Sequence, residues 1–214
     1  MSAGNQQERL SSEEEKRWFL AGLIEGEGSC TISIKQHATA KFGFYVDPEF
    51  FIYQHKNRRA VLELAIDVFQ SVRIFPKHGY PDVLVYAITS TKVIAEKVVP
   101  FLERYMPYSA RSSDYGKFGE AVRMFEAGAH RTQEGIERIV RLAYSMNHEG
   151  KQRKRPLQVV LDRILRGHTP DAPVPTRAKR WSDLLGDKES QAEYQTTWPS
   201  REAQWYPGWV TANA

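Results

Sequence analysis

The sequence is poor in cysteine and has no long apolar segment. Cys30 is the only cysteine among 214 residues, which excludes a disulfide framework and any zinc or iron–sulfur site built from several cysteines. The longest clean apolar stretch, Trp18–Ile24, is much shorter than the roughly 20 residues that a membrane-spanning helix needs. Residues 1–16 are polar and acidic and contain no stretch of the signal-peptide type. We therefore expect a soluble protein of a reducing compartment.

The composition is that of a folded domain with an uneven charge distribution. Hydrophobic residues make up 41% and aromatic residues 12%, which is enough for a packed core and excludes disorder throughout. The net charge is only +4, but basic residues outnumber acidic ones clearly in 31–80 and 151–180, between acidic ends. Such zones indicate either a polyanionic partner or ordinary solvated surface, and charge alone does not decide between them.

Hydrophobic periodicity predicts an α+β fold in the first half of the chain. A capping box at Ser12–Glu15 begins a helix that should end near Gly26 and Gly28. After it the patterns alternate as two strands, a helix, two strands and a helix, at about 30–35, 42–54, 57–68, 72–77, 83–89 and 91–105. This order is typical of helices packed on an antiparallel sheet. Pro48 suggests a sheet edge or a bulge, and Pro100 should kink or restart the last helix.

The rest of the chain divides into a helical part and a less regular end. Helical spacing recurs at about 118–127, 132–146 and 156–165, and a proline-rich linker follows. We divide the chain into a core at 12–106, a helical extension at 107–167, and a linker with a tryptophan-rich tail at 168–214. The basic run Lys151–Arg155 begins the last helix and fits either phosphate contacts or a solvated helix start.

Residues Phe19–Ser29 carry the most specific signal. Gly22 and Gly26 lie four positions apart on the predicted helix, a spacing of small residues that lets two helices approach closely. Glu27 falls at the C-terminal end of the helix, where the dipole disfavours negative charge unless a cation compensates it. If two copies of this helix pack together, two Glu27 carboxylates converge and, beside a phosphate, suit a hard divalent cation such as Mg²⁺. An ordinary core helix with a surface glutamate is the alternative.

The nine residues Leu20–Gly28, which read LAGLIEGEG, resemble the signature of the LAGLIDADG homing endonucleases, with conservative Glu-for-Asp and Gly-for-Ala changes. The predicted element order is similar to that family's αββαββα core with its saddle-shaped antiparallel sheet. Only one copy of the motif is present, and single-copy members of the family are homodimers. The resemblance thus implies a homodimer, with an exposed apolar helix face through Leu20 and Ile24. Its expected interface residues are Leu20, Ala21, Gly22 and Gly26.

The resemblance also implies roles for single residues. Glu27 would be the catalytic acid and a metal ligand, and the Gly26 carbonyl would join the metal shell. Gln54 and Arg58 match the family's active-site glutamine and a basic residue near it, and would position water and phosphate. Mg²⁺ is the expected cofactor, with Mn²⁺ able to substitute. Many members have a lysine after the Pro-Phe of the last core helix, but Phe101–Tyr105 contains none, and its Arg104 is a weak substitute.

Strand alternation predicts which side chains would face double-stranded DNA. If Cys30, Ile32 and Phe50 face the core, their neighbours along each strand face outward, and the family uses this outer face as a saddle on DNA. A glutamate there, Glu49, would accept a hydrogen bond from a cytosine amino group. The outward set consists of Thr31, Ser33, Lys35, His37, Glu49, Phe51, Tyr53, Arg73, Phe75 and Lys77.

The implied activity is a metal-dependent double-strand break near the centre of a long pseudo-palindromic target, which would promote intron mobility. Features at Val46–Phe50 and Val99–Phe101 resemble members encoded within introns of ribosomal RNA genes. The alternative is a non-cleaving nucleic-acid binder, such as an intron RNA splicing maturase or a DNA-binding regulator. We expect no membrane partner and no small-molecule substrate. We also expect no secretion: the protein would act in a bacterial cytoplasm, or in an organelle matrix or stroma if organelle-encoded.

Overall fold

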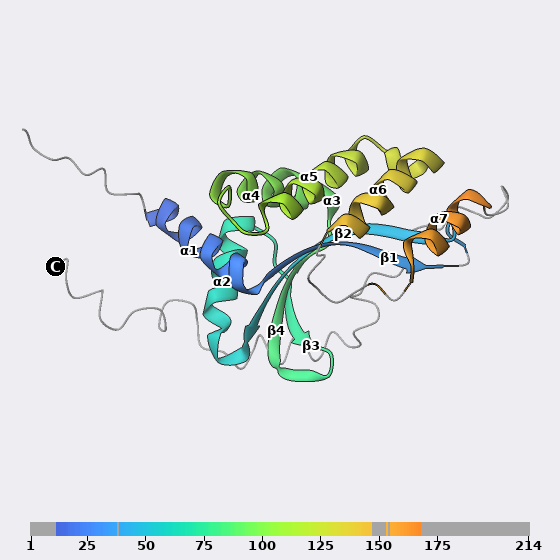
Figure 1. Ribbon diagram of the computed structural model, residues 1–214. Helices are drawn as coiled ribbons and strands as arrows, with labels where there is room; N and C mark the ends of the chain where they lie inside the picture. Colours follow the sequence, from blue (N-terminus) through green and yellow to red (C-terminus); the bar gives the residue numbers. More distant parts are fainter. Residues whose placement is uncertain (1–11, 38, 147–152, 154, 168–214) are drawn as a thin grey trace, which may run out of the picture. The chain divides into compact units, whose positions relative to one another are not determined.

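A computed structural model describes residues 12–37, 39–146, 153 and 155–167 (Figure 1). The chain divides into two units, residues 1–174 and 175–214, and all described residues lie in the first. The predicted tryptophan-rich tail and most of the Lys151–Arg155 run therefore lie outside the described residues. No helix in the described ranges is long and apolar enough to cross a bilayer.

The element order confirms the predicted α+β core. It runs α1 (Ser12–Glu27), β1 (Gly28–Gln36), β2 (Phe44–His55), a 3₁₀ turn η1 (Lys56–Arg58), α2 (Arg59–Phe69), β3 (Ile74–Lys77) and β4 (Tyr80–Ile88). The next helix has three parts, α3 (Thr91–Val93), a π-helical turn η2 (Ile94–Val98) and α4 (Val99–Tyr105). Pro100 lies in the first turn of α4, where a missing N–H breaks no helical bond, so the predicted restart is confirmed.

Three further helices follow the core elements. They are α5 (Ser112–Glu126), α6 (Gln133–Ser145) and α7 (Leu157–Leu165), with a 3₁₀ turn η3 (Ala129–Arg131) before α6. α5 begins six residues before the predicted start, because the polar residues of its first turn hide the apolar periodicity that begins at Tyr115. The β3–β4 connection is also shorter than expected, since Lys77 pairs directly with Tyr80.

The four strands form one antiparallel sheet in the order β1-β2-β4-β3. β2 is the long central strand: β1 pairs with it from Gly28–Ile52 to Gln36–Phe44, whereas pairing with β4 begins only at Phe50. Pro48 therefore lies where β2 has a strand neighbour only on the β1 side, which confirms the predicted edge position.

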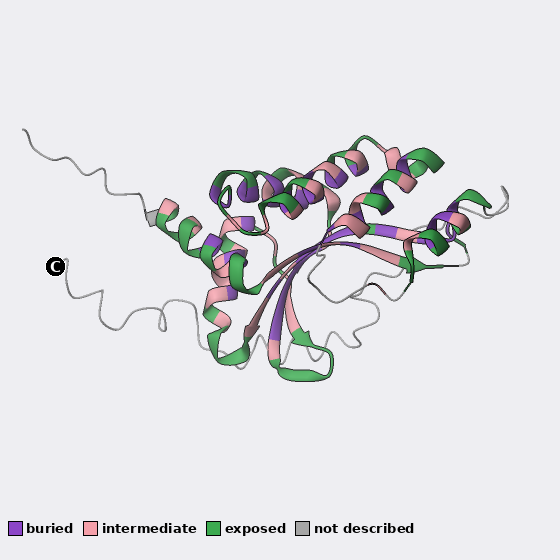
Figure 2. Cartoon of the chain, in the orientation of Figure 1, coloured by how far each residue is buried: buried purple, intermediate pink, exposed green. Residues whose placement is uncertain are grey.

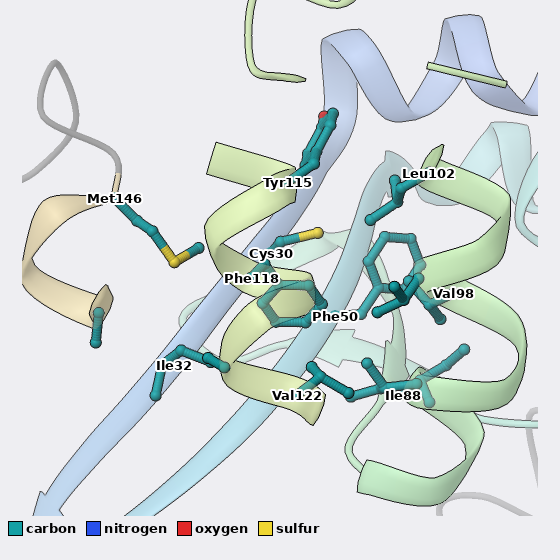
Figure 3. Packing of buried hydrophobic residues seen from close by; sticks show 14 of the residues in the cluster. Cys30, Ile32, Phe50, Ile88, Val98, Leu102, Tyr115, Phe118, Val122 and Met146 are labelled. Atoms are coloured by element: carbon teal, nitrogen blue, oxygen red, sulfur yellow. The ribbon is translucent and has the colours of Figure 1, made fainter. Parts of the chain in front are cut away.

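The hydrophobic core lies between one face of the sheet and the helices, with α4, α5 and α6 together on that side (Figure 1). Figure 3 shows strand residues such as Ile32 and Phe50 meeting Val98 and Phe118 from the helices. Buried residues follow the sheet and the inner sides of the helices (Figure 2). Residues of α5, α6 and α7 belong to the same buried cluster, so the extension shares the core rather than forming its own.

The junction between α1 and β1 has no room for a side chain at Gly28. A Cβ built there would lie 2.5 Å from the carbonyl oxygen of Ile24 and 2.7 Å from its Cγ2. Glycine thus allows α1 to end and β1 to begin within one residue. This abrupt junction places Glu27 directly at the start of the sheet.

Candidate nucleic-acid interface and catalytic site

Register places the predicted outward side chains on one face of the sheet. Thr31 lies opposite Glu49, and Tyr53 lies opposite Val85, which in turn lies opposite Phe75. Because side chains alternate along each strand, these residues share the face away from the buried Cys30. Lys35, His37 and Lys77 are exposed, and most of the others are half-buried. Asp47 belongs to the same face, and alternation alone would have found it.

Polar side chains cluster where β1 turns into β2. The rings of His37 and Tyr45 lie 4.8 Å apart, and the Thr39 hydroxyl lies 3.0 Å from His37 Nδ1 and 3.4 Å from the Tyr45 hydroxyl. His37 N donates to the Gly43 carbonyl oxygen at 3.0 Å, which closes the turn. The tip of this hairpin therefore presents hydrogen-bonding groups in fixed positions.

Cations and aromatic rings alternate at the β3 side of the same face. Lys77 Nζ lies 5.0 Å from the Tyr53 ring centroid and 4.9 Å from that of Tyr80, and the Arg73 guanidinium lies 5.3 Å from the ring of Phe75. Burial raises the pKa of Tyr53 above its usual value. Such a surface combines positive charge with apolar contact, as base-edge recognition requires.

Glu49 does not lie as the sequence suggested. It faces outward, but the residue is buried, and its Oε1 accepts a hydrogen bond from Lys35 Nζ at 2.8 Å. Its side chain is 10% exposed, against 45% for Lys35. Alternation gives the direction of a strand side chain but not the depth at which its neighbours cover it. The predicted free acceptor for cytosine is therefore an ion-paired carboxylate.

Glu27, Gln54 and Arg58 lie toward one end of the β1–β2 pair. Gly28 pairs with Ile52; Glu27, the last residue of α1, directly precedes Gly28, and Gln54 lies two residues after Ile52 on β2. Glu27 is exposed, and half-buried Gln54 accepts from the His55 N–H at 2.9 Å through its Oε1. Arg58 is exposed in η1, and its guanidinium has no hydrogen bond or ion pair with another described residue. The sequence predicted these positions, and their roles stay predictions.

A loop after α4 holds the end of α1. Arg111 Nη1 donates to the Gly28 carbonyl oxygen at 2.8 Å, and the Ser109 hydroxyl donates to the carboxylate of Glu25. Arg111 supplies the cation that the C-terminal end of α1 needs, and sequence reasoning missed it because it lies 83 residues away. Arg104, the weak substitute for the missing lysine, instead pairs with Glu14 at 3.3 Å.

The predicted dimer face of α1 is partly wrong. Leu20 is 0% and Ala21 6% exposed because both pack into the core of the single chain, and Ile24 is likewise fully buried. The exposed side of the helix carries Gly22 and Gly26 instead, with Phe19 at 59% exposure. The side chains of Leu20 and Ala21 are thus not available on an open apolar face.

Within the basic run before α7, Arg153 is not a fully exposed surface residue. Half-buried Arg153 donates to the carbonyl oxygens of Ile32, at 2.9 Å, and Ala143, at 3.0 Å, and its guanidinium lies 5.1 Å from the Tyr144 ring centroid. It connects the edge strand β1 to α6, so the expected phosphate contact does not hold for this residue. Lys151 and Lys154 lie outside the described residues.

The described residues of a single chain offer a partial metal site at most. The described residues contain no group of three or more histidine, cysteine, aspartate or glutamate side chains that could hold a metal ion. Glu27 and the last carbonyls of α1 provide hard oxygen donors at one point. Carboxylate and carbonyl oxygens suit Mg²⁺ or Ca²⁺, provided that other ligands complete the shell.

Comparison with known proteins places these features in one family. The family model described as LAGLIDADG endonuclease matches residues 20–122, from α1 into α5. DNA endonuclease I-CeuI of Chlamydomonas moewusii is 49% identical over 92 residues, which cover 43% of this chain and 42% of that protein. The chain thus spans less than half the length of this curated relative.

Solved structures show the same fold over a larger share of the chain. The group I intron-encoded homing endonuclease I-CeuI complexed with DNA matches with a TM-score of 0.66 and 34% identity, over 73% of this chain and 79% of that one. The archaeal intron-encoded homing endonuclease I-Vdi141I complexed with DNA matches with a TM-score of 0.66 and 31% identity, over 72% of this chain and 97% of that one. I-SmaMI, bound to an uncleaved DNA target in the presence of calcium ions, matches with a TM-score of 0.61 and 25% identity, over 68% of this chain and 48% of that one.

Proposed function

The chain belongs to the LAGLIDADG endonuclease family, and we propose from this premise that it is a site-specific homing endonuclease that cuts both strands of a DNA target. The observation that carries the proposal is that Glu27 is exposed, ends the signature helix and directly precedes the first residue of β1. A protein that only binds nucleic acid has no need of an acid there. DNA-bound relatives at 34% and 31% identity support double-stranded DNA as the partner.

LAGLIDADG endonucleases are metal-dependent nucleases, and a relative has been solved with calcium ions. We propose Mg²⁺ for this chain, held by Glu27 and the Gly26 carbonyl, with Mn²⁺ able to substitute. A hard cation bound there lowers the pKa of water and offsets charge developing on phosphate. The Arg58 guanidinium, which has no other described partner, would hold a phosphate oxygen, and the Gln54 amide would orient the attacking water.

A homodimer would complete this site. Gly22 and Gly26 are exposed in α1, and a Cβ built at either meets nothing within 4 Å, so the single chain does not require glycine there. Each glycine destabilises a helix by about 1 kcal/mol relative to alanine. Close approach of a second helix, which needs small residues at the contact, would explain why glycine stands at both positions. Two-fold packing through this face would bring together two copies of Glu27 near the axis.

The length of the outward face sets the length of the DNA target. A strand of nine residues such as β1 spans roughly 30 Å, or about nine base pairs at ~3.4 Å each. A two-fold dimer would therefore read about twice that length as a pseudo-palindrome and cut near its centre. If the gene lies in an intron, cleavage of the uninterrupted site would promote intron mobility.

The test is cleavage of a plasmid that carries the joined sequences flanking the gene, with the interrupted sequence as the matched control. We expect linear product only from the joined site, with Mg²⁺ and not with EDTA. Specific binding of the joined site with no cleavage under any divalent cation would instead support a DNA-binding regulator, and binding of the intron transcript a splicing maturase.

A further inference from the structure

An ion pair on the outward face of the sheet has a geometry that the residues' positions alone would not predict. Lys35 and Glu49 lie far apart along the strands: the residue opposite Glu49 is Thr31, four positions before Lys35 on β1. Four residues of strand span about 13 Å, yet Lys35 Nζ lies 2.8 Å from Glu49 Oε1. Neither side chain spans that distance alone, so the two extend toward each other along the face, and the ammonium is displaced toward the Glu27 end of β1, to about the level of the Ser33–Asp47 pair.

The Glu49 carboxylate defines where that ammonium lies. It accepts from Lys35 Nζ directly, at 2.8 Å. With 45% of the Lys35 side chain exposed against 10% for Glu49, the group that DNA meets at this point is the cation.

This arrangement separates two possible roles of the glutamate. A carboxylate that reads cytosine must reach the base edge with an accessible oxygen, and Glu49 is instead buried and ion-paired with Lys35. A lysine that reads guanine needs an ammonium held at one depth and one position in the major groove. The flexible stem of a lysine does not provide that precision by itself.

We propose, on the basis of the proposed function, that Glu49 is a positioning residue that fixes Lys35 to read a guanine. The guanine would lie nearer the centre of the target than the base pair facing the Lys35 backbone. Lys35 is then the specificity-determining group, and Glu49 acts through it without touching a base.

The experiment is selection of bound sequences from a randomised duplex DNA library by purified wild type, Glu49→Gln, Lys35→Met and the double variant. We expect both single variants to lose preference for the same guanine by about tenfold, and the double variant to lose no more than either. Lys35→Arg should keep a guanine preference, because arginine also donates to guanine O6 and N7. Glu137→Gln, which alters the Glu137–Arg141 pair on α6, is the matched control and should leave the profile unchanged.

Thermal unfolding of each variant shows whether it is folded. If Glu49→Gln does not fold, Lys35→Met still tests the pair independently. Loss of a cytosine preference in Glu49→Gln that Lys35→Met retains would overturn the inference and make Glu49 the reader. An unchanged profile in both would overturn it too. If wild type enriches no sequence, the proposed function itself fails, which distinguishes that result from failure of the positioning role.

Discussion

Replacing Gly22 by alanine would separate the stability of one chain from the association of two. Gly22 in α1 and Gly116 in α5 are both exposed, and a Cβ built at either meets nothing within 4 Å. Glycine-to-alanine replacement inside a helix stabilises it by roughly 0.8–1.0 kcal/mol. In a chain of this size that corresponds to an increase in melting temperature of about 2–4 °C. In a single chain, both variants should gain this much.

The two variants should differ only when two chains associate. The methyl group of Gly22→Ala would lie in the proposed contact between two α1 helices, twice per dimer, whereas that of Gly116→Ala would not. We expect Gly116→Ala to keep the dissociation constant of wild type, and Gly22→Ala to raise it, with Gly22→Leu monomeric at micromolar concentration. Sedimentation across a concentration series, combined with thermal unfolding at high dilution, measures both quantities. If Gly22→Leu dimerises like wild type, the homodimer does not form through this face of α1.

Other variants test single features of the fold. Gly28→Ala should destabilise the chain by about 1–3 kcal/mol in urea unfolding, because its methyl would overlap the Ile24 carbonyl; wild-type stability would contradict the tight junction. Arg153→Ala should cost about 1–3 kcal/mol and leave the salt dependence of DNA binding unchanged, while a flatter dependence would restore its phosphate role. Burial lowers the pKa of His130 below 6.5, so protonation favours the unfolded chain. Stability should therefore decrease as the pH falls below about 6.5, and His130→Gln should lack this decrease, which unfolding at pH 5 and 7.5 measures.

The order of elements could be predicted from the sequence because local patterns determine it. Alternating Cys30, Ile32 and Ile34 define a strand, and Gly28 defines the end of α1. The same alternation gave the correct side of the sheet for Glu49. It could not give the burial or the partner of Glu49, because both depend on neighbours such as Lys35, whose side chain extends along the strand to reach it.

Contacts between distant segments explain what the sequence could not provide. The apolar residues of α1 fit either a core or a dimer face, and only packing against the rest of the fold shows that Leu20 and Ala21 belong to the core. Arg111 has no motif around it, and its bond to the Gly28 carbonyl depends on how the loop after α4 folds back. Both misses concern tertiary neighbours, which a single sequence does not specify.

The most direct test of the account compares DNA binding and DNA cleavage by Glu27→Gln, with Glu25→Gln as control. Glutamine keeps the shape of Glu27 and removes its charge. Glu25 accepts a hydrogen bond from the Ser109 hydroxyl, and the amide oxygen of a glutamine at that position can accept the same bond. With Mg²⁺ and the joined flanking DNA, Glu27→Gln should bind as tightly as wild type or slightly tighter, while its cleavage rate should fall by orders of magnitude. Glu25→Gln should retain most of the cleavage. Near-normal cutting by Glu27→Gln would contradict its catalytic role, and loss of binding together with cutting would make Glu27 a structural residue.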